Sequence, residues 1–127
     1  MSKSPKMNVQ AVQRALRRCW SRSSSSLWSE GSPARGQCGV TALVVQDRFG
    51  GELLKTPVGD QWHFYNRIGG VRYDFTVEQF QAPPEYLDLA ANRDEAFADT
   101  DEGQYRYLSR KLKEAEVVFT DNFCSSD

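Results

Sequence analysis

The middle of the chain contains the segment GQCGVTALVVQDRF, residues 36–49, whose centre is apolar on almost every side. A segment of this kind is expected to be buried over most of its surface. Its valines alone would also allow a strand. We predict a helix because of the segment's length, and because Gly50-Gly51 follows it like a C-terminal stop signal. Cys38 would then lie in the first turn of a buried helix.

A helix is also expected on each side of this central segment. Residues 7–20 carry apolar side chains at helical spacing, with Asn8 placed to cap the start. Residues 21–35 form a serine-rich loop that Gly31-Ser32-Pro33 keeps from being helical. Near the C-terminus, Thr100 and Asp101 can cap a final helix. Its apolar stripe is Tyr105, Leu108, Leu112 and Ala115.

Between the central and final helices the hydrophobic pattern changes to that of strands. Residues 52–56, 61–68 and 71–76 read as strands, and Gly69-Gly70 between the last two is a strong hairpin signal. Residues 77–80 read as a helical turn, and residues 85–98 fit no single assignment. We therefore expect an α+β fold: a small antiparallel sheet of about three strands, a buried helix bearing Cys38, and flanking N- and C-terminal helices. The 127 residues suit one domain, with flexible tails at 1–6 and 120–127.

Composition narrows the class of protein. The 16 Lys+Arg and 17 Asp+Glu residues nearly cancel, which gives no bulk attraction to nucleic acid or to an anionic membrane. No apolar run approaches the roughly 20 residues that span a bilayer, and the basic N-terminus lacks the apolar region of a signal peptide. Three scattered cysteines do not make a disulfide framework. These features favour a cytoplasmic protein. We also expect no cofactor, since the sequence contains no glycine-rich phosphate loop.

The hairpin places the single histidine beside an aspartate. A two-residue turn at Gly69-Gly70 pairs Ile68 with Val71, and alternation then puts His63 on one face with Asp74 at a diagonal cross-strand position. Diagonal neighbours are about 7–8 Å apart at the backbone, so a hydrogen bond between these two side chains is available. Asn66 falls on the opposite, apolar face, which favours Asp74 over Asn66 as the group that orients His63.

Cys38 completes a pattern typical of thiol enzymes. The free N–H groups and the dipole at a helix start favour a thiolate. Cys38 would be the nucleophile, His63 the base and Asp74 the orienting carboxylate. The backbone N–H of Cys38, with the side chain of Gln37, would bind the oxyanion. One tension remains: a buried helix should pack on the apolar face of the hairpin, whereas His63 lies on the other face. Packing of the helix start across the sheet edge, or a longer turn that shifts the strand register, would resolve it.

Other uses of the same residues stay open. Taken singly, a buried cysteine is usually a small apolar side chain, and a lone strand histidine is usually a satisfied polar residue. A zinc site would draw on Cys19, Cys38, His63 and Cys124, but these lack the close-pair spacing of structural zinc ligands. A redox-sensing role for Cys38 lacks a resolving cysteine nearby in the sequence.

A family resemblance rests on a set of short segments along the chain: Gly36-Gln37-Cys38, residues 40–47, residues 50–55, residues 63–68, Gly70, residues 74–76, Gln79-Phe80, and the aromatic positions Trp20 and Trp28. On these segments the chain resembles the YunG-like family of small bacterial proteins. The resemblance covers about residues 9–115 and is most specific in the middle third. The serine-rich loop and the acidic stretch at residues 94–102 depart from it. The resemblance implies a cysteine–histidine–aspartate pattern similar to the papain-like superfamily, with Cys38, His63 and Asp74 at the matching positions. It implies no substrate.

These observations together predict a cytoplasmic thiol hydrolase or amidase with a papain-like core. It would act on an amide, isopeptide or peptide carbonyl, and Trp28, Trp62 and Tyr65 are the candidates for lining its cleft. The alternative is a non-catalytic binding module on the same scaffold, with a protein as partner. The sequence does not indicate the substrate or the oligomeric state.

Overall fold

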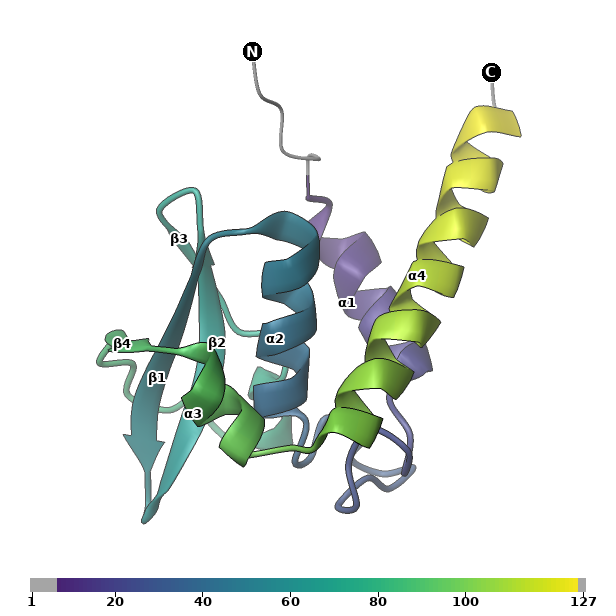
Figure 1. Ribbon diagram of the computed structural model, residues 1–127. Coiled ribbons are helices and arrows are strands. Elements are labelled where there is room, and N and C mark those ends of the chain that lie inside the picture. Colours follow the sequence, from purple (N-terminus) through teal and green to yellow (C-terminus); the bar gives the residue numbers. More distant parts are fainter. Residues whose placement is uncertain (1–6, 126–127) are drawn as a thin grey trace.

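The computed structural model describes residues 7–125, with side chains up to Ala115. Within this range the chain forms an α+β fold (Figure 1). The elements, in order, are α1 (Val9–Cys19), α2 (Cys38–Phe49), β1 (Glu52–Val58), β2 (Gln61–Ile68), β3 (Val71–Tyr73), the 3₁₀ turn η1 (Val77–Gln79), β4 (Leu89–Ala91), α3 (Arg93–Ala98) and α4 (Glu102–Ser125).

The strands form one antiparallel sheet in the order β3-β2-β1-β4. Helix α2 packs against β2 and β1, and also contacts α3 and α4. Helices α1 and α4 pack against each other on the side of α2 that faces away from the sheet (Figure 1). The central helix is thus enclosed between the sheet and the two terminal helices.

This enclosure explains why the α2 segment is apolar all round. Eight consecutive residues of α2, from Cys38 to Val45, are buried. Val40, Val44 and Val45 join a core cluster with α1 and α4, whereas Cys38, Ala42 and Leu43 join a second cluster with Leu53, Phe64 and Ala96. Helix α2 therefore belongs to both clusters and joins the sheet to the two terminal helices.

Most of the expected elements are confirmed. Asn8 caps α1 by accepting a hydrogen bond from the Ala11 N–H, and Gly50 forms the C-cap of α2. Gly69 and Gly70 both have positive φ, as a tight hairpin turn requires, and Ile68 pairs with Val71 in the predicted register. Asp101 accepts a hydrogen bond from the Gln104 N–H at the start of α4.

The sheet differs from the prediction at both edges. Residues 89–91 add a fourth strand, β4, which pairs with β1. This strand is only three residues long, too short to show a period in the sequence. At the other edge β3 ends at Tyr73, so the strand expected over residues 71–76 is three residues shorter than predicted. Beyond Tyr73 the chain leaves the sheet and turns into η1.

The termini of the chain also differ from the expectation. Helix α4 continues to Ser125, through most of the segment expected to be a flexible tail. The predicted tails at residues 1–6 and 126–127 lie outside the described residues, and Cys124 lies beyond the described side chains. Among residues 7–125, no helix combines the length and the apolar composition needed to cross a bilayer.

Candidate active site

His63 and Asp74 form a buried pair. His63 Nε2 lies 2.7 Å from Asp74 Oδ2, and the two side chains are only 2% and 5% exposed. Asp74 is held in turn by Thr76, whose backbone N–H donates to Oδ1 at 3.2 Å, and by Tyr86, whose hydroxyl donates to Oδ2 at 2.7 Å. The hydrogen bond predicted from the hairpin register is therefore confirmed, although Asp74 lies just beyond the end of β3.

The second nitrogen of His63 is available. With a proton on Nε2 directed at Asp74, neutral imidazole carries its lone pair on Nδ1. Nδ1 is buried and has no hydrogen-bond partner among the described residues. An unpartnered buried nitrogen is costly, so a native structure that keeps one calls for an explanation, and a role in chemistry is one.

The face of the sheet that carries His63 is covered by other side chains. The ring of Phe80 meets the His63 ring edge-on, with centroids 4.8 Å apart. The Tyr65 ring lies 5.7 Å from that of His63 and contacts the Tyr86 ring. The segment 74–88 thus returns across this face after β3 ends, which is why His63 is buried.

A polar clasp fixes this covering segment. Asp88 accepts hydrogen bonds from the Tyr65 hydroxyl at 2.9 Å and from Arg72 through two nitrogens at 2.8 and 2.7 Å. Asp88 has a φ of 54°, in the left-handed region that few non-glycine residues adopt. The guanidinium of Arg72 also lies over the Tyr86 ring. The clasp therefore holds Tyr86 against Asp74.

Cys38 is the first residue of α2, and its thiol faces a carboxylate that sequence reasoning missed. The Cys38 thiol donates to Asp99 Oδ2 at 3.4 Å, and the same oxygen accepts the Gly39 N–H at 3.0 Å. Asp99 is the C-cap of α3. A Cβ on Gly39 would lie 2.6 Å from Asp99 Oδ2 and 2.8 Å from the Ala96 carbonyl oxygen, so a glycine is what lets α3 approach α2 so closely.

The surroundings of Cys38 favour the neutral thiol. Burial raises the pKa of the Cys38 thiol above its ordinary value, and the negative charge of Asp99 raises it further. A hydrogen bond from the Phe64 backbone acts in the opposite direction. The expected stabilisation of a thiolate by the helix start is therefore reversed here, because the thiol is buried and because a carboxylate already accepts the Gly39 N–H.

One pocket brings the thiol and the imidazole together. Its volume is about 370 Å³, and Cys38, His63 and Asp99 are among the residues that line it. Leu27, Trp62 and Phe80 supply apolar walls. Cys38 contacts β2 at the Phe64 backbone, beyond the residues of β2 that pair with β3.

The remaining predicted residues lie in different places. Trp62 lines the pocket and is 45% exposed, with Lys55 Nζ 4.4 Å from its ring centroid. Trp28 packs against the core cluster of α1 and α4, and Tyr65 is buried beneath the clasp. Gln37 is fully buried, and neither of its amide atoms has a hydrogen-bond partner among the described residues. None of Trp28, Tyr65 and Gln37 lines the pocket.

Asn66 and Cys19 have structural roles elsewhere. Asn66 is buried, and its amide donates to the Ala42 carbonyl oxygen at 3.0 Å, which ties β2 to α2. This leaves Asp74 as the partner of His63. Cys19 belongs to the core cluster of α1 and α4, whereas Cys38 belongs to the other cluster. In the described part of the chain, no three His, Cys, Asp or Glu side chains gather in a way that could hold a metal ion.

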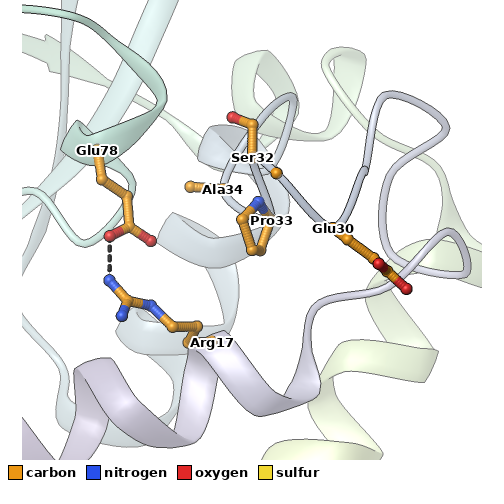
Figure 2. A pocket seen from close by; sticks show the side chains of 7 residues that line it. Arg17, Glu30, Ser32, Pro33, Ala34 and Glu78 are labelled. Carbon is orange, nitrogen blue, oxygen red and sulfur yellow. Dashed lines mark hydrogen bonds and ion pairs between the residues drawn. The ribbon is translucent and has the colours of Figure 1, made fainter.

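A second pocket lies apart from these residues. Figure 2 shows Arg17 of α1 and Glu78 of η1 joined by an ion pair at its side. Its volume is about 360 Å³, and the loop residues 30–34 supply the rest of its lining. Its lining contains no cysteine or histidine, so it offers no nucleophile or general base.

Comparison with known proteins identifies the family. Residues 8–116 match the family described as YunG protein. The chain belongs to the YunG family. One relative from Bacillus subtilis (strain 168), named "Uncharacterized protein YunG", is 58% identical over 100 residues, which cover 79% of this chain and 87% of the relative. No solved structure matches the chain. The family membership expected from the resemblance is thus confirmed, and it brings no activity with it.

Proposed function

We propose that this YunG-family protein is a thiol hydrolase or amidase that uses Cys38, His63 and Asp74. The observation that carries the proposal is the buried pair of His63 and Asp74, which leaves Nδ1 of His63 without a partner in the same pocket as Cys38. A carboxylate on one ring nitrogen and a nucleophile near the other is the arrangement of a triad by role. We also propose that the fold around these residues is a papain-like core, as expected from the sequence.

The reaction follows from these positions. His63 Nδ1 takes the proton of Cys38, and the Cys38 sulfur attacks the carbonyl carbon of an amide, isopeptide or peptide. As the carbon–nitrogen bond breaks, the imidazolium returns that proton to the leaving amine, which leaves a thioester on Cys38. Water then loses a proton to His63 and attacks the thioester. The carbon–sulfur bond breaks, an acid is released, and Cys38 is protonated again. A cytoplasmic location would keep the thiol reduced.

A specific observation favours a second candidate, a protein-binding module without catalysis. In this structure the Cys38 thiol is buried and hydrogen-bonded to Asp99 rather than to His63. A protein that never used the thiol could keep this arrangement permanently. The pocket, with Leu27 and Trp62 exposed at its side, would then serve recognition alone.

Covalent acylation separates the two candidates. The protein is incubated with p-nitrophenyl acetate, and acetyl groups on each cysteine are measured by peptide mass spectrometry. We expect an acetyl thioester on Cys38, formed at least about 10²-fold more slowly in His63→Gln, because general base catalysis is typically worth that much. Cys19→Ser is the matched control, since Cys19 is the other buried thiol that the structure describes, and this variant should acylate normally. Equal acylation of wild type and His63→Gln would refute the triad and favour the binding module.

A further inference from the structure

The carboxylate of Asp99 lies beside the Cys38 sulfur, where the carbonyl oxygen of a substrate would be expected during attack by the thiol. Oδ2 of Asp99 is 3.4 Å from the Cys38 sulfur and 3.0 Å from the Gly39 nitrogen. When a thiol adds to a carbonyl, the carbonyl oxygen becomes an oxyanion beside the sulfur and is stabilised by backbone N–H donors. Asp99 Oδ2 meets the same description: it is a negatively charged oxygen that is close to the sulfur and accepts a helix-start N–H.

We propose that Asp99 occupies the position that takes the substrate's carbonyl oxygen, and that it holds Cys38 as a neutral thiol until an acyl substrate displaces it. This inference rests on the proposed function and adds regulation to the same site. Catalysis would then require the carboxylate to move away from α2. The Gly39 N–H would then donate its hydrogen bond to the carbonyl oxygen of the substrate instead of to Asp99. The proton of the Cys38 thiol would be transferred to His63.

The placement of Asp99 suits such a displacement. Asp99 is exposed to solvent over part of its surface and lies in the short connection between α3 and α4, whereas Cys38 begins the run of eight buried residues in α2. The carboxylate can therefore leave while the thiol stays in place. His63 Nδ1, buried and unpartnered, is the independent sign that the occupied position is not the working arrangement of the pocket.

The charges around Cys38 point in the same direction. Asp99 from the α3–α4 connection and Asp74 from beyond β3 both oppose a thiolate. Asp74 is already hydrogen-bonded to His63 and Tyr86, whereas Asp99 contacts the thiol directly. Partial burial raises the pKa of Asp99 itself, and its hydrogen bonds from Cys38 and Gly39 act against that change. Of the two carboxylates, Asp99 is therefore the one whose removal should most favour ionisation of the Cys38 thiol.

The test measures the alkylation of Cys38 in Asp99→Asn. Asparagine has nearly the shape of aspartate and still accepts the Gly39 N–H, but it carries no charge. Rates of Cys38 modification at pH 7 are measured by peptide mass spectrometry with neutral iodoacetamide and with anionic iodoacetate. Asp101→Asn is the matched control, because Asp101 is two positions away and caps α4 without touching the thiol.

We expect Asp99→Asn to speed alkylation by iodoacetamide about tenfold or more, since each pKa unit changes the thiolate fraction tenfold. The gain with iodoacetate should be larger still, because a repelling charge is also removed. Asp101→Asn should behave like the wild type. An unchanged or slower rate in Asp99→Asn would overturn the proposal. If Asp99→Asn does not fold, as judged by urea denaturation, Asp99→Ser is read by the same criteria.

A second pair of variants separates this proposal from the proposed function. His63→Gln is combined with Asp99→Asn, and alkylation is measured as before. If removal of Asp99 speeds alkylation with or without His63, Asp99 restrains the thiol but His63 does not activate it, and the triad fails. If alkylation depends on His63 but not on Asp99, the triad survives and the proposal for Asp99 fails.

Discussion

Substitution of Gly39 by alanine should destabilise the protein, although alanine is the better helix former. Gly39 is the second residue of α2. Its Cβ would meet Asp99 Oδ2 at 2.6 Å and the Ala96 carbonyl oxygen at 2.8 Å, distances shorter than real Cβ contacts. The Ala96 oxygen belongs to the backbone of α3, so the whole helix must shift to admit the methyl group. Overpacking of this kind costs about 1–3 kcal/mol.

Gly103 offers a matched control within the same chain. It is the second residue of α4, and its Cβ would meet only the Asp101 Oδ1 at 3.3 Å. Gly103→Ala should therefore gain the helix propensity of alanine, up to about 1 kcal/mol, and require only a small adjustment of the Asp101 side chain. The same propensity gain applies at Gly39, so it cancels when the two variants are compared.

The assay is urea denaturation of both variants and the wild type. We expect Gly39→Ala to be less stable than Gly103→Ala by about 1–3 kcal/mol in the free energy of unfolding. This corresponds to a difference in melting temperature of roughly 4 °C per kcal/mol for a domain of this size. Equal stability of the two variants would refute the close approach of α3 to α2 on which the geometry of Asp99 depends.

Three further predictions concern the site, the core and pH. Tyr86→Phe removes one donor to Asp74 but keeps the ring, so it should cost about 1 kcal/mol in urea denaturation and slow acylation of Cys38; full activity in this variant would show that Tyr86 does not position Asp74. Leu43 is fully buried in the core, so Leu43→Ala leaves a cavity and should lower the free energy of unfolding by about 2–5 kcal/mol in the same assay. A smaller decrease would contradict the close packing of α2 on the sheet. Burial raises the pKa of Tyr65 to about 12, whereas its value in the unfolded chain is about 10. The folded state therefore binds this proton more tightly, and the free energy of unfolding should fall as pH rises from about 10 to 12. Urea titrations over this pH range should show a shallower fall in Tyr65→Phe, and an equal fall in both proteins would contradict the burial of the hydroxyl.

Local sequence signals predicted the elements that carry the two main groups of the site. The apolar run with a terminal glycine pair identified the helix that begins at Cys38, because enclosure on all sides demands such a run. The glycine pair of the hairpin fixed the strand register, and the register placed Asp74 beside His63. Each of these inferences depended on residues close together in the sequence.

Contacts between distant segments were beyond the reach of the sequence. Asp99 is 61 positions from Cys38, in a stretch whose secondary structure no periodicity indicated. The one available signal was Gly39, since a glycine inside a helix often marks a close approach by another backbone. Tyr86 was missed for a related reason: it lies in an irregular segment, and the sequence does not show that this segment folds back over the sheet.

The burial of α2 between two core clusters also divides the molecule by how readily its parts open. Backbone amides in the middle of α2 should exchange with solvent only when the whole domain unfolds, because neither cluster can separate without it. The short connection that carries Asp99 contributes no residue to either cluster, so we expect it to open more readily than α2. Cys38 belongs to one of the two clusters and Asp99 to neither, so we expect the carboxylate to leave the thiol far more often than the fold itself opens.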